Sequence, residues 1–128
     1  MRLSGLAVAA VLVATTTGLD AGGQVARAAD VRIEHGEATR SAGTWTFTVT
    51  LKHSDEGWDH YADLWQVLDP AGRVLAERVL THPHVEEQPF TRSLRGVEIP
   101  QDIATVFIRA RDSRHGFAPQ LFEIDLSR

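Results

Sequence analysis

Two histidines one residue apart, His82 and His84, are followed closely by Glu86 and Glu87. In an extended segment, residues i and i+2 project to the same side, so both imidazoles can point into one site while Pro83 stiffens the link between them. Imidazole nitrogen and carboxylate oxygen are common ligands of transition-metal ions. The stretch therefore suggests a metal site. A polar surface loop between two strands is the alternative reading of any single His-x-His pair.

The N-terminal segment has the pattern of an export signal. A positive residue at Arg2 precedes the apolar run Leu6–Ala14, and small residues lead up to Ala28. The apolar run is too short to span a bilayer, which takes about 20 residues. We therefore expect residues 1–28 to be a signal peptide, residues 29–128 to form one domain, and the protein to be periplasmic or secreted, with no membrane span after cleavage.

Composition limits the partners and the ligands. The chain has 17 acidic and 13 basic residues and a formal net charge of −4, which argues against nucleic acid as a partner. It contains no cysteine, so no disulfide supports the core even in a compartment that would permit one. The one methionine is the initiator. Any metal in the mature chain must be held by imidazole and carboxylate groups, which suits Cu(II) or Zn(II) better than Ca(II) or Mg(II).

Alternation of apolar and polar residues predicts strands throughout the exported part. The clearest stretch alternates threonine with Trp45, Phe47, Val49 and Leu51, which we expect to face a core. Val106, Ile108 and Ala110 form a second inward set, and Trp65 is the expected central core residue. The predicted strands cover about residues 30–40, 44–51, 60–68, 73–80, 90–94, 104–111 and 121–126.

Seven short strands with turn signals between them predict an all-β fold, a seven-stranded antiparallel sandwich of the immunoglobulin or fibronectin type III kind. The order of the elements, the Asp69–Gly72 turn and the Arg109–Ser113 end of the sixth strand resemble fibronectin type III domains over most of residues 29–128. That resemblance implies the architecture only, because such sandwiches carry many unrelated functions.

Antiparallel topology places the links after the second, fourth and sixth strands at the same end of such a sandwich. These links contain five of the six histidines, and only His35 lies elsewhere. We therefore expect a histidine-rich pole. The ligand set that we expect is His82, His84, His60 and His115, with His53 as a weaker member because it ends a strand and could face solvent.

Acidic and aromatic residues accompany these histidines. A carboxylate can complete a metal's coordination or orient a ligand imidazole by accepting its other N–H group. The aromatic side chains could contact a partner or seal the site from water, or they could form a small core under the loops. The acids that we single out are Asp59, Asp63, Asp112, Glu86 and Glu87, and the aromatics are Trp58, Tyr61 and Phe117.

Three motifs resemble those of small exported bacterial proteins that form a largely uncharacterised family: Gly57–Asp63, His82-Pro83-His84 and Asp112–Gly116. This resemblance implies an exported sandwich and no particular activity. The histidine-rich pole also resembles that of small periplasmic copper carriers. Those proteins commonly use an N-terminal amine next to a histidine, whereas the expected mature chain here begins at Ala29, so no ligand is carried over.

Two functions follow from these patterns. The first is an exported protein that carries, buffers or delivers Cu(II) or Zn(II) through the histidine-rich pole. The second is a non-catalytic adhesion or accessory module that binds a protein or glycan, such as a periplasmic or cell-surface partner, through the same loops. The sequence favours a binding protein over an enzyme: Asp112, Ser113 and His115 are too close in sequence to form a triad, and no nucleophile-elbow motif occurs.

Overall fold

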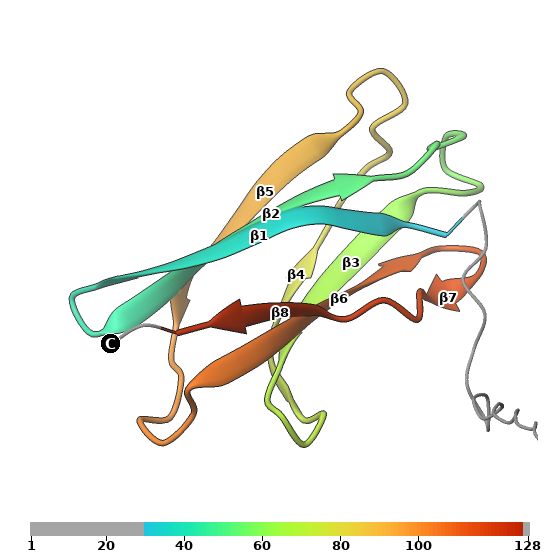
Figure 1. Ribbon diagram of the computed structural model, residues 1–128. Coiled ribbons are helices and arrows are strands. Elements are labelled where there is room, and N and C mark those ends of the chain that lie inside the picture. Colours follow the sequence, from blue (N-terminus) through green and yellow to red (C-terminus); the bar gives the residue numbers. More distant parts are fainter. Residues whose placement is uncertain (1–29, 127–128) are drawn as a thin grey trace, which may run out of the picture.

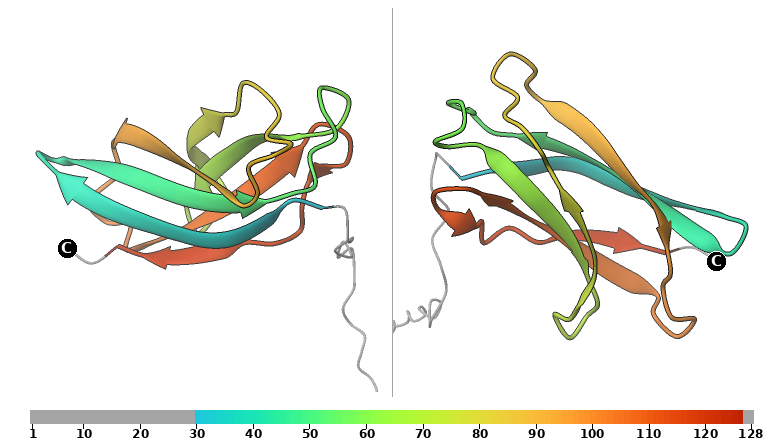
Figure 2. Two further views of the ribbon diagram at one scale, coloured as in Figure 1. Left: turned by 90° about the horizontal axis from the view of Figure 1, so that it is seen from above. Right: turned by 180° about the vertical axis from the view of Figure 1, so that it is seen from behind.

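A computed structural model describes residues 30–126 of the chain. These residues form two antiparallel sheets that pack face to face as a sandwich (Figure 1; Figure 2, left). The first sheet has the order β1-β2-β5, and the second has the order β4-β3-β6-β7, with β8 also paired to β6. The strands are β1 (Arg32–Ser41), β2 (Thr44–Lys52), β3 (Ala62–Leu68), β4 (Val74–Val79), β5 (Phe90–Val97), β6 (Thr105–Asp112), β7 (Gly116–Phe117) and β8 (Phe122–Asp125).

The core lies between the sheets and is built from the inward positions of the alternating strands. Trp45, Phe47, Val49 and Leu51 of β2 are all buried, which confirms the inward face expected from the sequence. Trp65 has no exposed surface and lies within the same hydrophobic cluster. Val106, Ile108 and Ala110 of β6 are buried in it as well. Apolar burial on this scale is the main term that stabilises a disulfide-free domain of this size.

The expected last strand, residues 121–126, is present as β8, but a further short strand, β7, begins where a turn was expected. The described residues therefore contain eight strands rather than seven. The two-residue β7 pairs with the end of β6, and β8 pairs with its beginning. Between them lies Pro119, which has no backbone N–H to donate to a ladder, so continuous pairing along β6 is interrupted.

The turn between β3 and β4 has the expected residues and hydrogen bonds. Between β3 and β4, the Gly72 N–H donates to the carbonyl of Asp69 at 2.9 Å, which closes a tight turn with Pro70 at its second position. Gly72 has a φ of 89°, a left-handed conformation that glycine adopts without steric cost. The Asp69 carboxylate accepts the N–H groups of Ala71 and Arg73.

The links β2–β3, β4–β5 and β6–β7 lie together at the opposite end, as the antiparallel order requires (Figure 1; Figure 2, right). The beginning of β1 reaches the same end. We call this end the histidine pole, because these three links carry His53, His60, His82, His84 and His115. His35 lies on β1, where its ring meets Phe122 edge-on at 6.2 Å.

Candidate metal centre

The residues at the centre of the histidine pole continue the inward faces of three strands. His53 follows Leu51 by two positions beyond the inward set of β2, and His60 precedes the buried Ala62 of β3 by two. Asp112 ends β6 two positions after the buried Ala110. Because side chains alternate across a strand, all three point between the sheets. The apolar core therefore ends in a polar cluster instead of opening to water.

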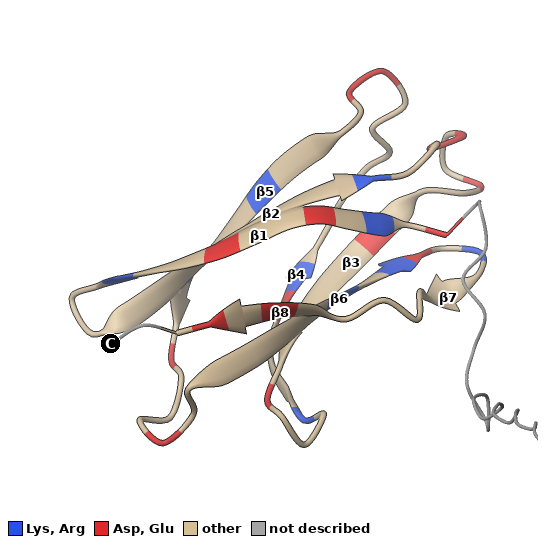
Figure 3. Ribbon diagram, in the orientation of Figure 1, with Lys and Arg blue, Asp and Glu red and all other residues tan. Residues whose placement is uncertain are grey.

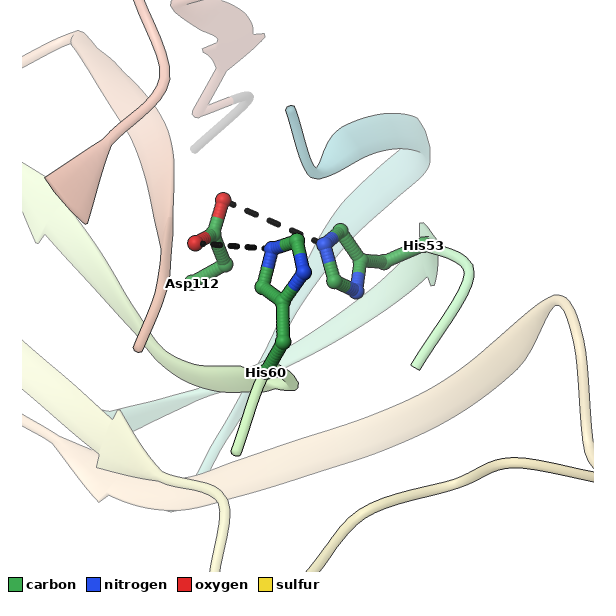
Figure 4. Close-up of side chains that lie close together, drawn as sticks. All are labelled: His53, His60 and Asp112. Carbon is green, nitrogen blue, oxygen red and sulfur yellow. Dashed lines mark ion pairs between the residues drawn. The ribbon is translucent and has the colours of Figure 1, made fainter. Parts of the chain in front are cut away.

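This cluster, His53, His60 and Asp112, is almost completely buried and is shown in Figure 4. The His60 Nε2 atom lies 3.3 Å from Oδ1 of Asp112, and the His53 Nε2 atom lies 3.9 Å from Oδ2. Neither Nε2 atom has a hydrogen-bond partner of acceptable geometry. One nitrogen from each ring and one carboxylate oxygen all lie within 4.8 Å of one another, so the cluster could hold a metal ion.

The other ring nitrogen of each histidine faces a second carboxylate. His53 Nδ1 lies 2.6 Å from Oδ1 of Asp55, and His60 Nδ1 lies 3.3 Å from Oε1 of the exposed Glu56. A carboxylate only accepts hydrogen bonds, so these two contacts favour the tautomer that carries the proton on Nδ1. In a neutral imidazole this leaves the lone pair on Nε2, and both lone pairs then face the Asp112 carboxylate.

Two lone pairs directed at a buried anion repel it unless a positive charge lies between them. The side chain of Asp112 is 1% exposed. Burial alone would raise its pKa, but the N–H groups of His115 and Arg114, with the His115 ring, outweigh burial and hold the pKa of Asp112 below its ordinary value. The cluster is therefore balanced either by protonation of the imidazoles or by a cation bound among the three groups.

Asp55 connects two of the three links that form the pole, β2–β3 and β4–β5. Its buried carboxylate accepts His53 Nδ1, the N–H of Ala62 at 3.1 Å and the N–H of His84 at 2.7 Å. Gln88 adds a second connection, because its amide accepts the N–H of His53 and donates to the carbonyl of His84. These bonds fix His53 and the β4–β5 link relative to each other.

The remaining histidines lie at different distances from the cluster. The His115 ring is 4.8 Å from that of His60, and its Nδ1 lies 3.3 Å from Asp112. His84 is buried and stacked on Phe90 at 4.0 Å, with neither ring nitrogen hydrogen-bonded. The two rings of the His-x-His pair are 4.7 Å apart, but His82 is exposed and faces the carbonyl of Pro83.

Several acids singled out in the sequence are engaged in other contacts. Asp63 forms two bonds with Arg111, which raise the pKa of that guanidinium further. The Glu87 carboxylate pairs with Arg92 at 3.2 Å, and this bond lowers the pKa of Glu87. Asp59 and Glu86 are exposed. Only Asp112 among the five joins the central cluster.

The aromatic residues line the outside of the pole. Trp58 is 67% exposed and meets the ring of Tyr61 edge-on at 5.6 Å. Phe117 is half-buried, with the guanidinium of Arg109 3.9 Å from its ring centroid. Both contacts are packing interactions with neighbouring residues of this protein.

Sequence reasoning placed too little weight on His53 and did not select Asp55 or Asp30. The signal for His53 was available, because it continues the strict alternation of β2. Asp55 follows His53 by two positions, but its role as a shared acceptor depends on how two links fold together. Asp30 lies two residues before the start of β1 and forms a second group of possible ligands with Asp112 and His115.

Burial of His84 leads to a prediction about pH. Burial, followed by the charges of Arg92 and His82, lowers the pKa of His84 from 6.5. The unfolded chain therefore binds a proton at this residue more readily than the folded chain does. The contribution of His84 to the free energy of unfolding is complete above pH 6.5 and is lost as the pH falls through the pKa of the folded state. We expect His84→Leu, which keeps a side chain of similar volume against Phe90, to change stability by about 1 kcal/mol or less at pH 8.

The variant should also lose less stability than the wild type on acidification. Urea unfolding of both proteins at pH 8 and pH 5.5 measures how much each free energy of unfolding changes with pH. His35→Leu is the matched control, since His35 is exposed and lies on β1 beside Phe122. An unchanged difference between the two pH values in His84→Leu would show that His84 does not contribute to acid sensitivity.

Part of this chain is similar to a curated protein. No family model matches this chain, and no solved structure matches it. A curated protein of Halomicrobium mukohataei named "Putative lipoprotein" is 44% identical over 79 residues. The matched region covers 62% of this chain and 38% of that protein, so the chain spans well under half of the relative's length.

Proposed function

We propose that this protein is an exported metal-binding protein that holds one divalent transition-metal ion through His53, His60 and Asp112. The observation that supports this most directly is the pair of buried Nε2 atoms that face a buried carboxylate without hydrogen bonds. Buried polar atoms are nearly always satisfied in folded proteins, so unsatisfied ones need an explanation. A cation bound among the three groups would be a partner for both Nε2 lone pairs and for the Asp112 carboxylate.

The distances fit such an ion. Zinc–nitrogen bonds are about 2.0–2.1 Å, so ligand atoms of a tetrahedral site lie about 3.3 Å apart. The distance of 3.3 Å from His60 Nε2 to Oδ1 of Asp112 already has this value, and the distance of 3.9 Å from His53 Nε2 to the other oxygen, Oδ2, needs a contraction of about 0.6 Å. The carboxylates on both Nδ1 atoms are the partners that metal-bound imidazoles usually have.

We propose Zn(II) or Cu(II) as the metal. Two imidazoles and one carboxylate suit ions of intermediate softness, and Cu(II) is the tighter binder by affinity order. Three protein ligands leave at least one coordination position open, for which His115 is the nearest further imidazole. An open position allows the ion to be passed on, which fits a carrier, buffer or delivery role.

Export is part of the proposal. The signal-peptide pattern lies in residues 1–28, outside the described residues, and the domain boundary at residue 29 was set from it. The name of the similar archaeal protein refers to a lipoprotein, which agrees with a location outside the cytoplasm. Among residues 30–126, no helix is long and apolar enough to cross a membrane. We also propose that the two sheets are a variant of the immunoglobulin or fibronectin type III sandwich.

The alternative function is a module that binds a protein or glycan. Trp58 and Val85 favour it, because both are large, apolar and more than half exposed on links of the histidine pole. Aromatic residues on exposed loops are common in binding surfaces. In this alternative, metal would bind weakly and Trp58→Ala would abolish partner binding.

Metal content separates the two functions. Protein exported and purified without a chelator or a histidine tag is analysed by mass spectrometry and then titrated calorimetrically with Cu(II) and Zn(II). We expect one ion per chain and release on acidification, because the imidazoles must be unprotonated to bind. Metal-free protein that binds both ions only weakly would contradict the proposal and favour the binding module.

A further inference from the structure

A polar cleft of about 180 Å³ lies beside the candidate metal centre and shares a wall with it. Its lining consists of Asp30, Arg32, Lys52, His53 and Ser54. His53 belongs to the central cluster, and Asp30 belongs to the neighbouring group with Asp112 and His115. His53 is therefore common to the cleft and to the proposed metal site, and its buried ring separates the two.

Two basic residues give this cleft an attraction for anions. Arg32 and Lys52 lie opposite each other in the β1–β2 ladder, and Lys52 is the only lysine of the whole sequence. Figure 3 shows basic bands at the ends of β1 and β2 that border the histidine pole. The Arg32 guanidinium contacts Glu34 through one nitrogen at 3.3 Å. A guanidinium has five N–H donors, so most of them can serve a second acceptor.

The volume limits what can enter. A water molecule takes up about 30 Å³ of the liquid, so the cleft has room for roughly six waters or one small molecule. The Ser54 hydroxyl adds a neutral donor to the two cations. Guanidinium, ammonium and hydroxyl groups together form charge-assisted hydrogen bonds with carboxylate or phosphate oxygens.

We propose that the cleft binds a small oxyanion, a carboxylate or a phosphate, whose oxygen occupies the open position of the metal. This inference rests on the proposed metal site. The ion supplies positive charge at one end of the cleft, and Arg32 and Lys52 hold the other oxygens of the anion. The metal would then be bound and released together with a small anionic ligand.

The test uses protein loaded with Cu(II), because its visible absorption responds to a change of ligand. Inorganic phosphate, and acetate in a parallel series, are titrated against sodium chloride of equal ionic strength. We expect the spectrum to shift with one phosphate or acetate per ion, and the stronger binder identifies the class of oxyanion. Metal-free protein should bind the same anion about tenfold more weakly or worse.

Variants locate the anion. Arg32→Gln and Lys52→Gln should each weaken anion binding about three- to tenfold and leave Cu(II) affinity unchanged. Arg40→Gln is the matched control, since Arg40 lies at the other end of β1, opposite Trp45, and should behave like the wild type.

Failure of this inference can be distinguished from failure of the proposed metal site. Tight Cu(II) binding with no spectral response to either anion would overturn this inference and leave the metal site intact. Unchanged anion affinity in both Arg32→Gln and Lys52→Gln would also overturn it, since the anion would then bind elsewhere. Absence of Cu(II) binding would overturn the metal site and this inference together.

Discussion

Alanine at His53 or His60 is expected to weaken metal binding about 100-fold or more, the largest effect in the molecule. Each substitution removes one of three protein ligands, whereas loss of a residue that only orients a ligand typically costs about 10- to 100-fold. Asp112→Ala should act at least as strongly, because it removes the only anionic ligand of the cluster. Calorimetric titration with Cu(II) or Zn(II) measures each change.

Controls come from the same pole. His82 is exposed and His35 lies on β1 against Phe122, so His82→Ala and His35→Ala should keep wild-type affinity within about threefold. Thermal unfolding without metal shows whether each variant is folded. Retained affinity in His53→Ala and His60→Ala, with loss in His82→Ala, would transfer the site to the exposed His-x-His pair.

Asp55→Ala is expected to destabilise the fold by about 3–5 kcal/mol. The carboxylate is fully buried and accepts three donors: His53 Nδ1 and the N–H groups of Ala62 and His84. Alanine leaves all three without their acceptor. The unfolding midpoint of a domain of this size should fall by about 12–40 °C. Urea and thermal unfolding of the metal-free protein measure this.

Asp55→Asn provides a milder test if the alanine variant does not fold. Its amide keeps one acceptor oxygen but directs an NH₂ group at a backbone donor, so we expect a loss of about 2 kcal/mol. Asp59→Asn is the matched control, because Asp59 is exposed in the same link and should change stability by about 0.5 kcal/mol or less. Equal effects of the two asparagine variants would contradict the role of Asp55 as a shared acceptor.

Much of the sandwich could be predicted from alternation. The strands were expected within a few residues of their observed bounds, since the inward faces of β2 and β6 read directly from the sequence. The additional two-residue strand β7 could not be read in this way. It depends on which part of β6 each short strand pairs with, and Pro119 alone signalled an interruption.

The site could be predicted only in outline. Strand order correctly placed the links with five histidines at one end. The ranking of the histidines came from the His-x-His motif, which favoured His82 although it is exposed in the fold. The alternation of β2, continued by two residues, favours His53 instead. The role of Asp55 as a shared acceptor could not be foreseen, because one of its donors, His84, lies 29 residues further along the chain.

The central claim is that a metal ion lies among His53, His60 and Asp112. The most direct test is a crystal structure of protein loaded with Zn(II) or Cu(II), with anomalous diffraction measured at the absorption edge of the metal. We predict one strong anomalous peak within bonding distance of both Nε2 atoms and an Asp112 oxygen. A peak at His82 and His84, or no peak in metal-saturated crystals, would contradict the claim.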